Sequence, residues 1–258
     1  MSSPKLAIVT GASSGIGLEI AKLAAQDGYD LVVVADTPFV EAGPALKEFG
    51  VEVQQVEADL ATQQGVEQLL AMVGGRPADV LVANAGHGLG HGFLDQSPQE
   101  WQHIVNTNIT GTLLLIQPIA KRMVERGQGR ILITGSIAGH MAGTFQAVYN
   151  GSKAFIDSFA AALNEEIKGS GVTVTCLKPG ATETEFFHRA EMEDTKIGQA
   201  KKDDPTDVAK AGWEAMNKGE PSVIYGLKNK LQVAGAEMMT DAMTAKMHRA
   251  QAEPGSGS

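Results

Sequence analysis

Short apolar runs alternate with longer segments of helical periodicity along most of the chain. The runs lack polar alternation, as expected of parallel strands that are covered on both faces. We predict strands at 6–9, 31–35, 51–56, 80–83, 130–134, 172–177 and 222–225. We predict helices at 14–28, 40–49, 63–74, 98–126, 146–169 and 205–218. This rhythm predicts an α/β fold, a doubly wound parallel sheet of about seven strands with helices on both faces.

No internal repeat and no break in composition marks a second domain, so we expect a single domain over residues 1–250. Two segments fall outside the strand–helix rhythm. Residues 185–204 belong to a polar, irregular stretch, and residues 227–249 have the pattern of an added C-terminal helix. We expect the Gly- and Ser-rich end, 251–258, to be a disordered tail.

Composition narrows the class of protein. A net charge of −9 and a pI near 5.2 argue against a nucleic-acid or anionic-membrane partner. No apolar stretch approaches the length of a membrane span, and the first residues lack a signal-peptide layout. The single cysteine, Cys176, excludes an intrachain disulfide and lies in an apolar run, which indicates a buried structural thiol. We therefore expect a reduced, cytoplasmic protein.

A glycine-rich turn follows the first predicted strand and opens the first predicted helix. Residues 10–17 read Thr-Gly-Ala-Ser-Ser-Gly-Ile-Gly. Glycines let the backbone turn tightly and approach a pyrophosphate, and the helix N-terminus adds amide donors. A plain strand-to-helix turn is the alternative interpretation. The candidate dinucleotide contacts here are Gly11, Ser13, Ser14, Gly15, Ile16 and Gly17.

Asp36 ends the second predicted strand, about twenty residues after the glycine turn. A carboxylate at this place can accept hydrogen bonds from the adenosine ribose hydroxyls, and it repels a 2′-phosphate by like charge. The next residue is Thr37 rather than Arg, and the glycine turn contains no basic residue. These features favour NAD over NADP. A solvated Asp36 that caps the following turn is the alternative.

Polar and small residues also follow the third and fourth predicted strands. They are Asp59 and Leu60 after the third strand, and Asn84, Ala85 and Gly86 after the fourth. Ligands of doubly wound folds bind outside the carboxyl ends of the strands. Asp59 is therefore a candidate contact for the adenine edge. The small residues at 85 and 86 would let the cofactor lie against the backbone.

Tyr149 and Lys153 form a candidate proton-transfer pair. They are four residues apart and so share one face of a predicted helix. A nearby cation lowers the pKa of a phenol, which suits proton transfer near neutral pH. Ser136 follows the fifth strand as a candidate donor to a substrate carbonyl, or else as a loop serine that bonds the backbone. Asn108 is unfavourable inside a helix, which indicates either a buried polar role or a solvated face.

The six histidines do not assemble a metal site in the sequence. His87 and His91 are four apart, but they lie in a glycine-rich loop where helical facing does not apply. No further Cys or His completes a set of ligands, so we predict no metal. His87 is a candidate for substrate contact.

Taken together, these residues resemble the short-chain dehydrogenase/reductase family over roughly residues 5–184. One departure is Ala83, where the family often has a further Asn before Asn84. The stretch 179–202 is similar to that of a bacterial subgroup with undefined natural substrates. The matching motifs are Thr10-Gly-x-x-x-Gly15-x-Gly17, Asp59-Leu60, Asn84-Ala85-Gly86, Asn108, Ser136, Tyr149-x-x-x-Lys153 and Pro179-Gly180-x-Thr182-x-Thr184.

The resemblance implies a Rossmann-like oxidoreductase that transfers a hydride between NAD and a secondary alcohol or ketone. It implies that Tyr149 is the acid/base, and that Lys153 lowers the tyrosine pKa and binds the nicotinamide ribose. Ser136 would hold the substrate oxygen. Asn108 would connect Lys153 to solvent through an ordered water.

The resemblance also implies roles outside the catalytic group. Thr184 and the backbone after Pro179, including Gly180 and Thr182, would hold the nicotinamide carboxamide. The two long helices at 98–126 and 146–169 would form a homodimer or homotetramer.

We expect residues 185–204 to form a substrate lid, because Phe186, Phe187, Met192 and Ile197 lie among charges there. The segments 87–94, 137–141 and 145–146 would complete the pocket, and their few charges favour a neutral, partly apolar substrate. Two alternatives stay open. One is an NADP-dependent carbonyl reductase of the same family, and the other is a non-catalytic dinucleotide-binding sensor.

Overall fold

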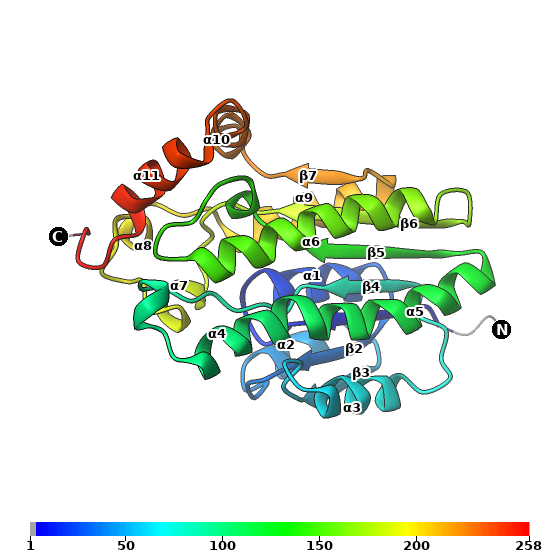
Figure 1. Ribbon diagram of the computed structural model, residues 1–258. Helices are drawn as coiled ribbons and strands as arrows, with labels where there is room; N and C mark the ends of the chain where they lie inside the picture. The colour runs from blue at the N-terminus through cyan, green and yellow to red at the C-terminus, as the bar shows by residue number, and fades with distance from the viewer. Residues whose placement is uncertain (1–3, 258) are drawn as a thin grey trace.

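One parallel sheet runs through the middle of the protein, as the computed structural model of residues 4–257 shows (Figure 1). The sheet order β3-β2-β1-β4-β5-β6-β7 is that of a Rossmann-like fold, so the predicted class and the seven strands are confirmed. All six strand pairings are parallel. The strands are β1 (Leu6–Thr10), β2 (Asp30–Ala35), β3 (Val53–Glu57), β4 (Val80–Ala83), β5 (Gly129–Thr134), β6 (Val172–Lys178) and β7 (Ser222–Ile224).

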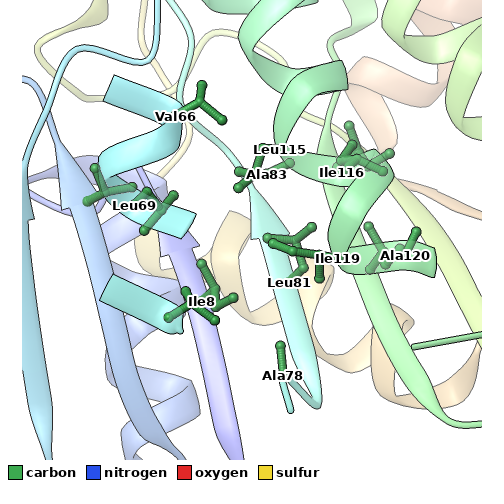
Figure 2. Close-up of a cluster of buried hydrophobic side chains, with 14 of the residues drawn as sticks. Ile8, Val66, Leu69, Ala78, Leu81, Ala83, Leu115, Ile116, Ile119 and Ala120 are labelled. Carbon is green, nitrogen blue, oxygen red and sulfur yellow. The ribbon is translucent and has the colours of Figure 1, made fainter. Parts of the chain in front are cut away.

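The strands β1 to β6 send alternate side chains into two separate cores. On β1, Leu6 and Ile8 pack into one core, and Ala7 and Val9 pack into the other. The first core is covered by α3 (Gln63–Val73), α5 (Thr112–Arg126) and α6 (Ala147–Glu166), as Figure 2 shows for the part around Ile8. The second is covered by α1 (Gly15–Gln26), α2 (Ala42–Lys47) and α9 (Pro205–Lys218). Burial on both faces explains why the strands read as continuous apolar runs.

The helix predicted over 98–126 is continuous in space but not uniform. It consists of α4 (Pro98–Val105), the π-helical segment η2 (Asn106–Gly111) and α5. Ser97 and Glu100 form a capping box at its start. A π-helical turn inside an α-helix is frequent at functional sites, and this one contains Asn108, which is 2% exposed.

The C-terminal region differs from the single helix expected over 227–249. It forms α10 (Leu227–Glu237) and α11 (Asp241–Ala252), and the Thr240 side chain caps α11 by accepting from the Met243 N–H at 3.4 Å. The expected tail boundary also differs, since α11 runs to Ala252 and the turn after it donates from Gly257 N to Asp194 O at 2.9 Å. Ser258 lies outside the described residues.

The segment 185–204 contains two short helices, α7 (Phe186–Arg189) and α8 (Lys196–Gln199). The buried residues Phe187, Ala190 and Met192 pack with Ala252 of α11 in a third cluster, which is distinct from the two cores of the sheet. We call this the lid cluster. Two short 3-10 turns, η1 (Phe93–Asp95) and η3 (Ile137–His140), lie in loops after β4 and β5. Within residues 4–257, no helix combines the length and the apolarity needed to cross a membrane.

Candidate active site

The ends of three strands are joined by one asparagine at the point where the sheet order reverses. Asn84, after β4, donates from its backbone N to Thr10 Oγ1 at 2.9 Å and from Nδ2 to Thr10 O at 3.1 Å. Its Oδ1 accepts from Thr134 Oγ1 of β5 at 3.0 Å. The ends of β1, β4 and β5 are thereby held at the edge where such folds bind ligands.

The glycine turn lies against this edge and is too tight for side chains. Gly11 has φ 65°, and a Cβ at Gly17 would lie 2.1 Å from Gly11 O. A Cβ at Gly15 would lie 2.7 Å from the Thr184 Cγ2 atom, so the turn also approaches the segment after β6. Of the six predicted contacts, four line the main cavity and Gly15 and Gly17 shape the turn instead. The four are Gly11, Ser13, Ser14 and Ile16.

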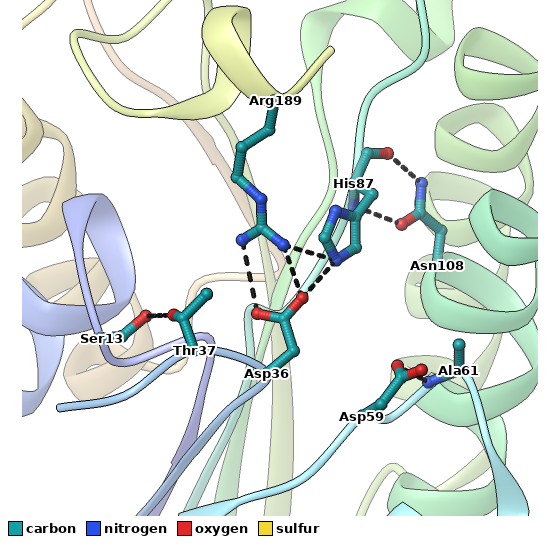
Figure 3. A network of polar contacts seen from close by, with 8 residues as sticks. All are labelled: Ser13, Asp36, Thr37, Asp59, Ala61, His87, Asn108 and Arg189. Carbon is teal, nitrogen blue, oxygen red and sulfur yellow. Dashed lines mark hydrogen bonds and ion pairs between the residues drawn. The ribbon is translucent and has the colours of Figure 1, made fainter. Parts of the chain in front are cut away.

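Asp36, at the end of β2, lies in a network of charges that the sequence did not indicate (Figure 3). Arg189 of α7 donates to both of its carboxylate oxygens, at 2.5 Å and 3.4 Å. His87 Nε2 lies 3.0 Å from Asp36 Oδ2 and 3.3 Å from an Arg189 nitrogen. The hydrogen bond from His87, together with those from Arg189, holds the pKa of Asp36 well below its usual range. Asp36 is thus a carboxylate whose oxygens are already contacted by Arg189 and His87.

Residues after β3 and β4 line the same cavity. Asp59, Leu60, Ala85 and Gly86 all border it, as expected. The Asp59 carboxylate also accepts from Ala61 N at 2.8 Å, which fixes its orientation. A Cβ at Gly86 would lie 3.4 Å from Lys153 Nζ, so glycine keeps the space in front of the lysine open.

Tyr149 and Lys153 both lie on α6, are 8% and 6% exposed, and line the cavity. The Lys153 ammonium donates to Thr134 O at 2.8 Å and lies 5.9 Å from the centre of the Tyr149 ring. The Phe186 ring of α7 covers the tyrosine ring, with the two ring centroids 5.1 Å apart. The predicted pair is therefore assembled beneath α7.

Burial, and not Lys153, dominates the proton affinity of this pair. Burial raises the pKa of Tyr149 to about 12; a hydrogen bond with Ser136 opposes this rise, and the Asp157 carboxylate adds to it. Burial also lowers the pKa of Lys153. This differs from the expected lowering of the tyrosine pKa, because the sequence pattern shows spacing but not the loss of solvent. In this environment Tyr149 carries its proton at neutral pH.

Asn108 in η2 makes three hydrogen bonds with its side chain. Its Oδ1 accepts from His87 N at 2.9 Å, and its Nδ2 donates to His87 O at 3.0 Å and to Ser152 Oγ at 2.9 Å. It therefore holds the loop after β4 against α6. Its contact on α6, Ser152, directly precedes Lys153. Of the two readings of Asn108, the buried polar role is the one found. Its expected water-mediated link to Lys153 stays a prediction.

Ser136 lies directly after β5 and is 6% exposed. Its hydroxyl donates to Pro179 O at 3.4 Å and accepts from Ala138 N at 3.1 Å. The buried Asp157 carboxylate accepts weakly from Ser136 N at 3.4 Å and is raised in pKa mainly by burial. Ser136 thus contacts the backbone, as the alternative reading expected, and also faces Tyr149 in the cavity.

The segment after β6 closes the cavity from the other side. Pro179, Gly180, Thr182 and Thr184 all line it. Thr182 Oγ1 donates to Gly180 O at 3.0 Å, and Thr184 Oγ1 accepts from Phe186 N at 3.2 Å at the start of α7. This backbone therefore leads directly from the predicted nicotinamide contacts into α7.

Three cavity residues make contacts that the sequence analysis did not anticipate. His87 was a candidate substrate contact but lies at Asp36. Arg189 and His248 reach the cavity from α7 and α11, and no local pattern indicates that they do. Cys176 is buried as predicted, and burial raises its pKa to about 12. Among the described residues, no three or more His, Cys, Asp or Glu side chains form a group able to hold a metal.

A glycine turn, an acidic residue after β2 and a Tyr–Lys pair around the switch point of such a sheet define a nucleotide-binding, Rossmann-like oxidoreductase. The profile of the family described as short chain dehydrogenase matches residues 5–195. The chain belongs to the short-chain dehydrogenase/reductase family, whose members are oxidoreductases acting on CH–OH groups.

Named relatives agree with this assignment. The chain is 35% identical over 183 residues to a serine 3-dehydrogenase of Rhizobium radiobacter, covering 69% of this chain and 72% of the relative. It is 29% identical over 255 residues to an (S)-acetoin-forming diacetyl reductase of Staphylococcus epidermidis, covering 92% and 97%. A short-chain dehydrogenase from Sphingobium yanoikuyae, solved with NADPH, superimposes with a TM-score of 0.80 at 28% identity and covers 92% and 96%.

Proposed function

We propose that the protein transfers a hydride between NAD and a secondary alcohol or ketone, with Tyr149 as the acid/base. The observation that carries the proposal is the position of Tyr149. Its side chain is buried, hydrogen-bonded with Ser136, and borders the same cavity as the glycine turn and Asp36. A phenol in that position can exchange a proton with a substrate oxygen while a dinucleotide lies alongside.

The residues around the cavity fit a dinucleotide. The glycine turn leaves no room for a Cβ at Gly17, and the N-terminus of α1 presents amides suited to a pyrophosphate. Asp36 offers acceptors to the adenosine ribose, and Asp59 borders the neighbouring adenine position. Lys153 and Thr184 would hold the nicotinamide ribose and carboxamide. When bound, the nicotinamide donates or accepts the hydride.

In the direction of reduction, the protein's own task is to supply a proton. Tyr149, neutral because burial raises its pKa to about 12, donates its phenolic proton to the carbonyl oxygen as the hydride adds to the carbonyl carbon. The Ser136 hydroxyl donates to the same oxygen where negative charge develops. Lys153 would stabilise the resulting phenolate, and Asn108 would connect Lys153 to solvent through an ordered water, from which the replacement proton comes. Alcohol oxidation runs through the same groups in reverse.

The lid excludes water from this chemistry. Phe186 covers the Tyr149 ring, and Phe187 is 7% exposed within the lid cluster. An apolar cover strengthens electrostatic interactions beneath it and keeps bulk water from the hydride path. We infer that residues 185–204 act as the substrate lid within a single catalytic domain spanning 1–250.

The preference for NAD rests on Asp36, because a carboxylate accepts from ribose hydroxyls and repels a phosphate. The NADP alternative is favoured by one observation, the contact of Arg189 and His87 with that carboxylate. A guanidinium there can pair with a 2′-phosphate. Of the two cofactors, we favour NAD. The end of β2 fixes the position of the Asp36 carboxylate, whereas the position of the Arg189 guanidinium depends on the proposed lid.

Titration of NADH and NADPH by tryptophan quenching tests the choice of cofactor. We expect NADH to bind more tightly than NADPH. We also expect Asp36→Ala to reduce the difference in affinity between the two cofactors. Arg189→Gln is the matched variant, since it should weaken NADPH binding more than NADH binding. Equal or tighter NADPH binding by the wild-type protein would contradict the preference for NAD.

The charge of the chain and its family bear on its substrate, location and assembly. A net charge of −9 disfavours nucleic acid and anionic membranes as partners, so we propose a small alcohol or carbonyl compound as the partner, in the cytoplasm. A homodimer or homotetramer is the proposed assembly. A screen of alcohols, ketones, sugars and steroid-like compounds with both cofactors, read by absorbance of reduced nicotinamide, tests the activity. The absence of turnover throughout would contradict it.

A further inference from the structure

The C-terminal helix α11 supplies one wall of the cavity that contains Tyr149. Thr144 Oγ1 donates to Ala245 O at 2.8 Å, and Ala142 N donates to Thr244 Oγ1 at 3.3 Å. These bonds fasten α11 to the loop directly before α6, the helix that carries Tyr149. A side chain on the inner face of α11 is therefore fixed relative to the reacting groups.

His248 is that side chain, and its hydrogen bonding leaves one ring nitrogen without a partner. It is 4% exposed and lines the cavity. Its Nδ1 lies 2.8 Å from Thr144 O, and because a carbonyl only accepts, Nδ1 carries the proton. Burial lowers the pKa of His248, so the ring is neutral and Nε2 is an acceptor. Nε2 has no hydrogen-bond partner among residues 4–257.

Gln146 adds a second unpaired polar group, from the loop directly before α6. It lies three residues before Tyr149, is 4% exposed and lines the cavity. No described residue hydrogen-bonds its side-chain amide. Both side chains line the cavity and neither polar group has a partner among the described residues, so a ligand in the cavity can complete their hydrogen bonds.

The remaining walls define the rest of the ligand. Met141, Phe186, Phe187 and Ile197 present apolar surface to the cavity. Among the described cavity residues the only cations are Lys153 and Arg189, and these are bonded to Thr134 O and to Asp36. No cation is therefore left to receive a carboxylate or phosphate of the substrate.

We propose that the substrate is a neutral, apolar-bodied ketone or secondary alcohol that carries a second hydroxyl, which donates its hydrogen to His248 Nε2 and is also bonded by the Gln146 amide. This inference rests on the proposed oxidoreductase function and specifies its substrate class. It assigns the C-terminal helix a role in selecting the substrate rather than in the chemistry. A site built to bind a hydroxyl discriminates strongly against the analogue that lacks it.

Matched pairs of ketones test this proposal. The pairs are cyclohexanone against 4-hydroxycyclohexanone, and steroid ketones with and without a distant hydroxyl, each assayed for kcat/KM with reduced cofactor. We expect at least one hydroxylated member to be preferred by about tenfold, the value of one or two hydrogen bonds. The cyclohexanone with a carboxylate at the same carbon should be a poorer substrate than either neutral compound.

Two variants locate the effect. His248→Asn keeps a donor for Thr144 O but removes the Nε2 acceptor, and it should reduce the preference to about threefold or less. Gln146→Met removes the amide at similar volume and should reduce the preference partly. Gln68→Met, the same change as at Gln146 but at an exposed position on α3, is the control and should leave the preference intact.

Binding separates failure of this proposal from failure of the proposed function. If no ketone is turned over, calorimetry with NAD-loaded protein still measures the binding affinity of each member of the same pairs. Tighter binding of the hydroxylated members that is lost in His248→Asn would support the substrate class without the oxidoreductase function. Equal kcat/KM and equal binding within every pair, or a preference that survives in His248→Asn, would overturn it.

Discussion

At the scale of single residues, the central feature is a buried phenol whose environment favours its neutral form. Burial raises the pKa of Tyr149 to about 12, and the Asp157 carboxylate acts in the same direction. A neutral phenol is ready to donate a proton to a carbonyl, whereas alcohol oxidation first requires its deprotonation. In the proposed mechanism, this environment keeps on Tyr149 the proton that ketone reduction consumes.

A pH profile checks this directly. Below its pKa the phenolate fraction of Tyr149 rises about tenfold per pH unit. We expect kcat/KM for alcohol oxidation to climb steadily from neutral to alkaline pH, and kcat/KM for ketone reduction to stay nearly flat. Oxidation that is independent of pH over this range would show that Tyr149 is not the group that must lose a proton.

Residues that reach the cavity through their local backbone could be located from the sequence, and residues brought together from a distance could not. A short stretch of sequence is enough to recognise the glycine turn, Ser136 after its strand, and the spacing of Tyr149 and Lys153. Arg189 reaches Asp36 across 153 residues, and His248 reaches Thr144 across 104. Those contacts depend on how the lid and α11 fold back over the sheet, which no local pattern encodes.

At the scale of elements, strand positions were predictable because burial on both faces leaves a continuous apolar run. The helix over 98–126 was predicted as uniform, but it contains the π-helical η2 around Asn108. The C-terminal helix divides at residues 238–240. Both departures occur at elements that border the candidate site, where side-chain hydrogen bonds such as those of Asn108 override periodicity.

Residues 185–204, the proposed lid, have a small core of their own in the lid cluster. Phe187→Ala removes a ring that is 7% exposed in the lid cluster. We expect KM for the ketone to rise by about tenfold through loss of lid ordering, while Tm falls by only about 3 °C because the sheet cores are untouched.

Steady-state kinetics and thermal melting measure the two effects. Met72→Ala, an exposed position on α3, is the control and should change neither. A large fall in Tm with unchanged KM would show that the lid cluster supports the whole fold rather than substrate binding.

At the scale of the whole molecule, the sheet order brings the residues after β1, β2, β3, β4, β5 and β6 to one cavity at the carboxyl ends of the strands. Exposed apolar side chains lie on two of the long helices, Leu114 and Val124 on α5 and Phe155 on α6. Phe155 stacks on Phe159 with ring centroids 6.2 Å apart. A face of this kind suits contact with a second copy of the chain.

Light scattering checks the assembly. We expect the wild-type mass to be two or four times the 27.1 kDa of one chain. Phe155→Glu should shift the mass towards the monomer, because it places a charge within the apolar face, and Met72→Glu on α3 should not. A monomeric wild-type protein would contradict the proposed homo-oligomer.

The most direct test of the account is Tyr149→Phe, assayed for turnover and for cofactor binding in the same preparation. It removes one hydroxyl and keeps the ring that packs against Phe186. The account predicts that oxidation and reduction fall to a few per cent or less, with nearly unchanged affinity for NADH. Activity well above that level would remove Tyr149 from the acid/base role, and a wild-type protein that binds cofactor without turnover would identify a sensor instead.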